Sequence, residues 1–172
     1  MIKSKAGKWH YLDASAMVKL VFDEGDCQPL LNFFRTNSSY CATLMCVTEA
    51  LSVLKGKWAG KKMSMEQYVE STYELVIYTQ RRENQYDSKI VIDDADILNP
   101  GVYDEVRGIV EKHNLDLSDA LQLHSILRGK FAHLIGGSAS VLITADKGLA
   151  KAATVEGVRV WNCIVDAVPN WD

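Results

Sequence analysis

Short apolar runs, each followed by a segment with helical spacing, recur along the chain. The alternation is seen in "WHYLDAS" before "AMVKLVF", in "SSYCATLMC" before "VTEALSVLKGKWAG", in "SKIVIDDADI" before "VYDEVRGIVEKH" and "LSDALQLHSILRG", and in "SVLITADKG" before "LAKAATVEG" and a last run, "VRVWNCI". Strands that alternate with helices of this length are typical of crossover units in a parallel sheet. The runs "IVI" and "VLIT" consist of apolar or β-favouring residues without interruption, as expected of strands buried on both faces. The pattern predicts an α/β fold, a parallel twisted sheet sandwiched by helices.

The middle of the chain carries a longer helical pattern, "SMEQYVESTYELVIYTQRRENQ". Its apolar residues recur at spacings of three and four, which predicts a long helix packed over the sheet. They are Met65, Tyr68, Val69, Tyr73, Val76 and Ile77. The chain has no internal repeat, low-complexity tract or linker rich in Pro, Gly or Ser, and its 172 residues suit one domain. We therefore expect a single domain over residues 1–172.

Composition, net charge and cysteine pattern limit the classes of protein to which this chain can belong. Hydrophobic residues make up 48% of the chain and charged residues 24%, which is ordinary for a soluble globular protein. The formal net charge is −3 and the pI about 5.8, so a nucleic acid would have to be met by a local basic patch. The four cysteines form no CxxC pair and have no paired histidines nearby, which argues against a zinc site and favours reduced thiols. With no signal peptide and no membrane span in the pattern, we expect a cytoplasmic protein.

Four carboxylates follow the predicted strands at corresponding places. In open parallel sheets, ligands bind outside the carboxyl ends of the strands, so acidic residues there are candidates for chemistry. Asp13 ends the first strand, and Asp146 follows "VLIT" just before a new helix. Glu49 lies near the start of an amphipathic helix, and Asp119 lies in the first turn of another, after Ser118 as a plausible N-cap.

Each of these carboxylates has a purely structural explanation. Asp is a common N-cap, and an acid in the first turn of a helix gains about 0.3 to 1 kcal/mol from the helix dipole. Together, however, four acids at the same end of four successive units would repel one another unless a cation lay among them. Mg²⁺ or Mn²⁺ suits such hard oxygen ligands, and it would activate water and neutralise charge that develops on a phosphate. The set therefore predicts metal-dependent chemistry on a phosphate ester.

In order and context, the segments "LDAS", "TEAL", "SDAL" and "TAD" resemble the PIN domain. This is a family of metal-dependent ribonucleases that includes the VapC-type toxins of bacterial and archaeal toxin–antitoxin pairs. The resemblance covers nearly the whole chain, from about Tyr11 to Trp161. It implies a sheet sandwiched by helices, one or two Mg²⁺ or Mn²⁺ ions, and endonucleolytic cleavage of RNA by metal-activated water. It also implies a homodimer and a cognate antitoxin protein as partners.

The functional residues of the family can be carried over one by one. Its four acids, as catalytic residues and metal ligands, fall on Asp13, Glu49, Asp119 and Asp146. Ser15 matches the small hydroxyl residue that follows the first acid by two positions, and Thr144 matches the hydroxyl residue before the last acid. Asp116 either caps its helix or helps to hold the metal, and we favour capping.

Two segments depart from the family pattern or add to it. Extra length lies around residues 55–100, and the acidic string "IDDADIL" (Asp93, Asp94 and Asp96) is interpreted as a solvated strand end or loop rather than as extra ligands. The segment "LKGKWAGKK" offers candidate RNA contacts, because lysines meet phosphates and an aromatic residue can stack on a splayed base. These candidates are Lys55, Lys57, Trp58, Lys61 and Lys62. The alternative is a solvated helix end with Trp58 packed inward.

Two other functions compete with a nuclease. A phosphatase of the haloacid dehalogenase type also begins with an Asp after the first strand, but it needs a second Asp two positions later, where this chain has Ser15. The other reading is a PIN-like module that binds RNA or protein without catalysis. Degenerate members of that kind usually lose acids, whereas all four are present here. The histidines show no ligand spacing, and no Ser–His–Asp arrangement or phosphate-binding glycine loop is found.

Overall fold

The structure is a computed structural model that describes residues 9–37, 39–80, 88–93, 95–132 and 140–170. Five short strands form its sheet: β1 (His10–Leu12), β2 (Tyr40–Ala42), β3 (Ile90–Ile92), β4 (Val141–Thr144) and β5 (Arg159–Asn162). All described pairings are parallel, and the strand order is β3-β2-β1-β4-β5. The central strand β1 pairs with β2 on one side and with β4 on the other. The predicted α/β class with a parallel sheet is confirmed.

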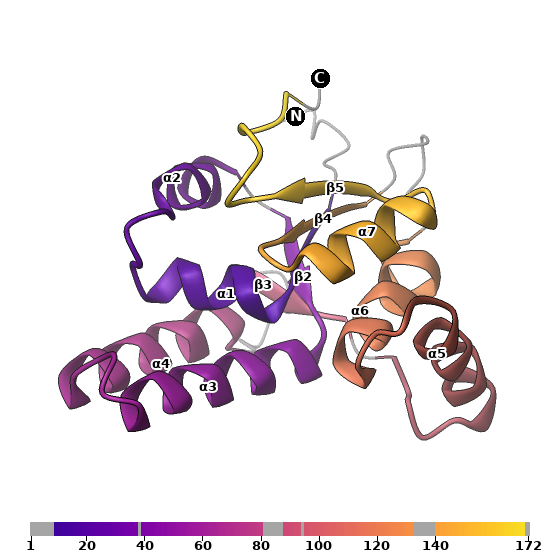
Figure 1. Cartoon of the computed structure of the whole chain (residues 1–172), viewed down its shortest axis with the longest axis horizontal. Coiled ribbons are helices and arrows are strands. Elements are labelled where there is room, and N and C mark those ends of the chain that lie inside the picture. The colour runs from indigo at the N-terminus through magenta and orange to yellow at the C-terminus, as the bar shows by residue number, and fades with distance from the viewer. Residues whose placement is uncertain (1–8, 38, 81–87, 94, 133–139, 171–172) are drawn as a thin grey trace, which may run out of the picture.

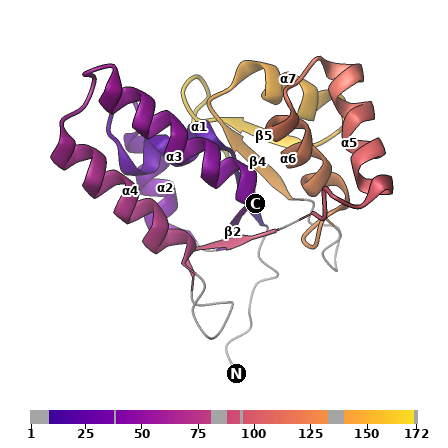
Figure 2. The ribbon, with the colours of Figure 1, turned by 90° about the horizontal axis from the view of Figure 1, so that it is seen from below.

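Helices cover both faces of this sheet (Figure 1). They are α1 (Ala14–Val21), α2 (Gln28–Thr36), α3 (Leu44–Ala59), α4 (Met65–Thr79), α5 (Pro100–His113), α6 (Leu117–Arg128) and α7 (Lys147–Val155). Figure 2 shows α1 to α4 gathered on one side of the sheet and α5 to α7 on the other. None of the helices in the described ranges is long and apolar enough to cross a membrane.

Successive residues of each strand belong to different cores, because side chains alternate across a sheet. Leu12 and Ala42 join the core under α1 to α4, whereas their neighbours Tyr11 and Cys41 join the core under α6 and α7. Both faces of the sheet are thus covered by buried apolar side chains, which explains the continuous apolar runs in the sequence. All four cysteines are free and buried, as expected of reduced thiols.

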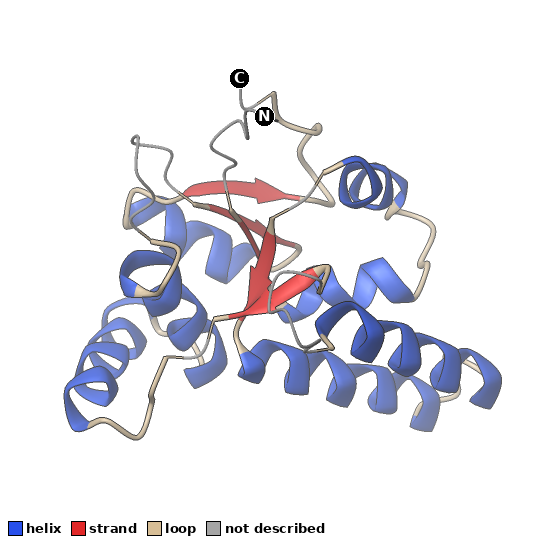
Figure 3. Ribbon diagram, turned by 180° about the vertical axis from the view of Figure 1, so that it is seen from behind, coloured by secondary structure: helices blue, strands red, loops and turns tan. Residues whose placement is uncertain are grey.

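Helix α4 is the exception to the predicted packing. Its buried side is formed by Ser71 and Leu75, with the half-buried Tyr68 and Tyr78 alongside them. The other apolar residues of the pattern point outward, with 37% to 68% of their surface exposed: Met65, Val69, Tyr73, Val76 and Ile77. The helix contacts the sheet at β3 but packs chiefly against α3 and α1 (Figure 3), so Ser71 and Leu75, and not these five residues, face the core.

Asp93 corrects the interpretation of the acidic string. Its side chain is 4% exposed, and it accepts hydrogen bonds from the Tyr11 hydroxyl and from the Lys130 backbone N–H at 3.3 Å. A Cβ atom at Gly129 would lie only 2.4 Å from the Asp93 carboxylate, so the close approach requires glycine there. Asp93 is therefore a buried anchor between β3 and the end of α6, whereas Asp96 is exposed and Asp94 lies outside the described residues.

Candidate functional site

Asp13 stands at the carboxyl end of the central strand and is the N-cap of α1. Its side chain is only 2% exposed, and its Oδ1 accepts the Ala16 backbone N–H at 2.7 Å. Asp13 is therefore a helix cap, as the structural explanation predicts. A cap, however, needs one carboxylate oxygen, and it does not require that the group be buried in the core.

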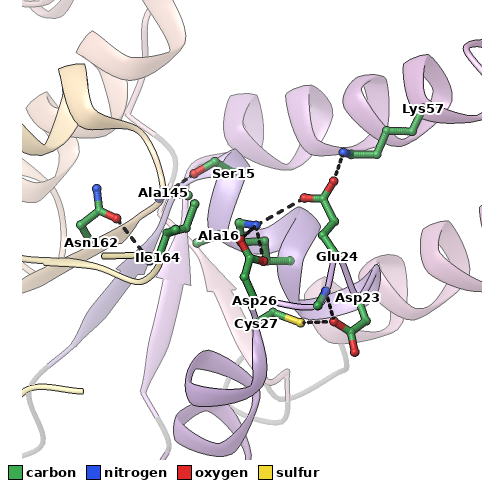
Figure 4. Close-up of polar contacts among 12 residues, drawn as sticks. Ser15, Ala16, Asp23, Glu24, Asp26, Cys27, Lys57, Ala145, Asn162 and Ile164 are labelled. Atoms are coloured by element: carbon green, nitrogen blue, oxygen red, sulfur yellow. Dashed lines mark hydrogen bonds and ion pairs between the residues drawn. The ribbon is translucent and has the colours of Figure 1, made fainter. Parts of the chain in front are cut away.

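Two hydroxyl groups fix the Asp13 carboxylate. The Ser15 hydroxyl lies 3.0 and 2.9 Å from its two oxygens, and the Thr144 hydroxyl donates to Oδ2. The same hydroxyls accept backbone N–H groups of the β4–α7 turn, Ser15 from Ala145 and Thr144 from Asp146, each at 2.8 Å. Figure 4 shows the link between Ser15 and Ala145. This network joins the corner after β1 to the corner after β4, where Asp146 caps α7.

A second network holds the Glu49 side chain and the first turn of α6, where Asp119 lies. Asp116 is the N-cap of α6, and its Oδ1 accepts the Asp119 backbone N–H at 2.9 Å. The Ser118 hydroxyl lies 3.0 Å from that same Oδ1 and 2.5 Å from Glu49 Oε2. One hydroxyl proton thus lies between two carboxylates from different helices. Ser118, which the sequence suggested only as an N-cap, is instead the contact between α6 and the Glu49 side chain.

The electrostatics join the two networks into one site. Burial and, to a smaller extent, the nearby charges of Asp116, Asp13, Asp146 and Glu49 together raise the pKa of Asp119 to about 7. Burial likewise raises the pKa of Asp13 to about 6, against the hydrogen bonds from Thr144, Ala16 and Ser15, and the Asp146 charge adds to the rise. The charges of the other three predicted acids therefore all act on Asp119 across the same edge of the sheet.

Gln122 was missed by the sequence reasoning. It is fully buried on α6, three residues after Asp119, and its Nε2 donates to the Leu12 carbonyl at 3.3 Å. Its Oε1 accepts the Thr43 backbone N–H at 3.4 Å, at the start of the helix that carries Glu49. It holds β1, α3 and α6 together behind the acids. A glutamine in an amphipathic helix gives no signal in the sequence that it turns inward.

The donor chemistry at this edge fits a hard divalent cation, since all four candidate ligands are carboxylates. Within the described residues, no lysine, arginine or histidine forms an ion pair with Asp13, Glu49, Asp119 or Asp146. The side chains as placed do not surround one point, and no group of three or more His, Cys, Asp or Glu residues in the described ranges is arranged to hold a metal ion. The structure thus brings the acids to one edge and couples their charges without gathering their oxygens.

The candidate RNA contacts lie farther along α3. Lys57 pairs with Glu24, and Trp58 stacks on Tyr68 with ring centroids 5.2 Å apart while 37% of its surface stays exposed. At about 1.5 Å per residue, Trp58 stands roughly 14 Å along the helix from Glu49. Lys55, Lys61 and Lys62 are exposed. The basic segment is thus at the far end of α3, and Lys57 already has a carboxylate partner there.

An apolar hollow of about 490 Å³ adjoins the second network. It lies between the start of α3, the loop after β3 and α6, and it shares these two helices with Glu49 and Asp119. Leu44 and Leu98 in its lining are 56% and 89% exposed. Exposed leucines around a hollow are unusual on a free surface, so this face is a candidate for covering by another molecule.

No family model matches the sequence, and no curated protein matches it. Solved structures match over most of its length. PAE2754 from Pyrobaculum aerophilum aligns at a TM-score of 0.56 and 14% identity over 92% of this chain and 89% of that one. FitAB bound to an IR36 DNA fragment aligns at 0.54 and 12% over 95% and 99%. FitAcB from Neisseria gonorrhoeae aligns at 0.49 and 14% over 90% and 97%. The sheet order and flanking helices match PIN-domain structures, so the fold is PIN-like.

Proposed function

We propose that this chain is a metal-dependent endoribonuclease that hydrolyses RNA phosphodiester bonds, and that it is the toxin of a toxin–antitoxin pair. One observation carries the proposal. Four carboxylates lie at the carboxyl edge of a parallel sheet, two with raised pKa values and none with a cationic partner among the described residues. Such groups are typical of functional sites, because an unpaired charge in the interior is otherwise selected against.

In this proposal Asp13, Glu49, Asp119 and Asp146 hold Mg²⁺ or Mn²⁺. When bound, the ion activates a water molecule and neutralises charge on the phosphate. Ser15 and Thr144 fix the orientation of Asp13, since both hydroxyls donate to its carboxylate. Ser118 does the same for Glu49. Asp116 caps α6 and adds negative charge beside Asp119.

The partners belong to the same proposal. RNA would lie along α3 toward the exposed Lys55, Lys61 and Lys62, whose charges give affinity without sequence preference. A second copy of the chain would cover the apolar hollow around Leu44 and Leu98, beside the acids. The antitoxin is proposed from the resemblance of the segments "LDAS", "TEAL", "SDAL" and "TAD" to the VapC-type toxins.

A PIN-like module that binds RNA or protein without catalysis is the second candidate. It is favoured by the placement of the carboxylate oxygens, which do not surround one point. The two candidates differ in whether a divalent ion has any effect on RNA.

The deciding experiment is cleavage of a mixed RNA pool with Mn²⁺ and with EDTA. Three variants are compared with the wild type: Asp13→Asn, Asp119→Asn and, as a control, Asp104→Asn, an exposed carboxylate on α5. We expect cutting by the wild type and the control in Mn²⁺ only, and a loss of at least about a hundredfold in the other two. Equal cutting by all four proteins would refute the assignment. RNA binding without cutting by any of them would favour the second candidate.

A further inference from the structure

The outer side of α4 carries an apolar stripe that nothing in the described structure covers. Its members, which we call the α4 stripe, are Met65, Val69, Tyr73, Val76 and Ile77, and they are 55%, 53%, 68%, 47% and 37% exposed. Their spacing places them on one side of the helix, opposite the buried Ser71 and Leu75. Five large apolar side chains on one helix face exceed what scattered surface residues explain, and they mark a binding face.

The first part of the stripe is hollowed. Met65, Val69 and Tyr73 line a shallow depression of about 360 Å³, together with Glu66 and Glu70. Anchors at successive turns of a helix, with a depression between them, are how one amphipathic helix receives side chains of another. Tyr73 is the most exposed of the set and provides a large, rigid contact surface of the kind that dominates binding energy in interfaces.

The charge around the stripe identifies the occupant. Helix α4 contains Glu66, Glu70 and Glu74 and no lysine or arginine. Glu66 and Glu70 are exposed and stand in the wall of the depression. This negative rim disfavours RNA, whose phosphates it would repel, and it likewise disfavours a second copy of α4, which would bring further glutamates. A complementary partner combines apolar residues with lysine or arginine.

We propose that the α4 stripe is the docking face for a basic amphipathic helix of a protein partner. The apolar side of that helix covers the α4 stripe, and its cationic residues pair with Glu66 and Glu70. The proposal rests on this surface alone and does not depend on the nuclease assignment. The acids at the sheet edge belong to other elements, so the two can fail separately.

The test is titration of the full chain with a labelled model helix of about 14 residues made of leucine and lysine, followed by fluorescence anisotropy. A peptide with glutamate in place of lysine is the counterpart. We expect the wild type to bind the lysine peptide, with affinity that falls as salt rises. Val69→Asp and the double variant Glu66→Lys/Glu70→Lys should each weaken binding by at least about tenfold.

The charge-reversed variant makes the test specific, because it should prefer the glutamate peptide over the lysine peptide. The matched control is Asp104→Lys/Glu111→Lys, which makes the same change of net charge on exposed residues of α5 and should behave as the wild type. The proposal would be overturned if Val69→Asp and Glu66→Lys/Glu70→Lys both bound the lysine peptide with the affinity of the wild type. It would also be overturned by a wild-type dimer in analytical ultracentrifugation that Val69→Asp converts to a monomer, because the occupant would then be a second copy.

Discussion

Two groups of acidic side chains in this protein have opposite electrostatic surroundings. In the first, after α1, the buried Lys19 donates to Asp26 at 2.7 Å and to Glu24 at 3.3 Å, and Lys57 pairs with Glu24 (Figure 4). In the second, at the carboxyl edge of the sheet, the donors that Asp13 meets among the described residues are two hydroxyl groups and a backbone N–H. Both groups contain several carboxylates, but only the first contains its own cations among the described residues.

The pKa values follow this difference. The Lys57 bond lowers the pKa of Glu24, and burial alone would lower that of Lys19, but its bonds to Asp26 and Glu24 outweigh burial and raise it. At the sheet edge the shifts run the other way, with Asp13 raised to about 6 and Asp119 to about 7. The fold therefore neutralises the first group itself and leaves the second with a charge that a cation from solution can neutralise. That contrast separates a structural cluster from a candidate site.

Removing the cation of the first group should have the largest effect on stability. Lys19→Met leaves Asp26 and Glu24 without their shared partner and takes away a buried ammonium bonded to both. Breaking a buried pair costs about 3 to 5 kcal/mol, and we expect about 2 to 3 here because the two acids are partly exposed. Urea unfolding followed by circular dichroism measures it, with the exposed Lys151→Met as the control. A loss no greater than that of the control would remove the contrast between the groups.

Neutralising an acid of the second group should do the opposite. Between about pH 4 and 7 the folded protein keeps Asp119 protonated while the unfolded chain ionises it, so this carboxyl lowers stability as pH rises. Asp119→Asn cannot ionise. In EDTA near pH 8 it should therefore be more stable than the wild type by about 1 to 2 kcal/mol, with allowance for its partial exposure. The gain should vanish below about pH 4, and unfolding curves across this range would contradict the account if the difference did not change with pH.

The smallest effect is expected from the hydroxyl that joins the two helices of the site. Ser118→Ala removes the contact with Glu49 and Asp116 but leaves the cap of α6 in place. We expect Mn²⁺ affinity to fall by about tenfold, as is typical for groups that orient a ligand, with less than about 1 kcal/mol of change in stability. Ser52→Ala, a serine on the exposed side of α3, is the control. Calorimetric Mn²⁺ titration of both variants separates an orienting role from a merely structural one.

Much of the fold could be predicted from local pattern. The apolar runs gave the strands, and the place of Asp13, Glu49, Asp119 and Asp146 at one edge follows from the parallel order, because parallel strands end at the same side. The spacing of apolar residues does not show which face of a helix packs against another helix. That is why the apolar pattern of α4 does not reveal that Ser71 and Leu75 form its buried side.

The remaining errors and omissions involve partners far apart in the sequence. Asp93 is buried because Tyr11, 82 positions away, donates to it, and Lys57 is engaged because Glu24, 33 positions away, lies beside it. Gln122 turns inward to reach the ends of β1 and β2. Each is a tertiary contact, and nothing in the residues around it distinguishes it from a surface polar group.

The central claim is that the second acidic group, and not the first, binds a divalent cation. Its most direct test is calorimetric titration of Mn²⁺ near pH 8, where Asp119 is ionised, into the wild type, Asp119→Asn and Asp26→Asn. The account predicts that the wild type and Asp26→Asn bind Mn²⁺ with similar affinity and that Asp119→Asn binds at least about a hundredfold more weakly. Equal affinity in all three proteins, or no binding by the wild type, would contradict it.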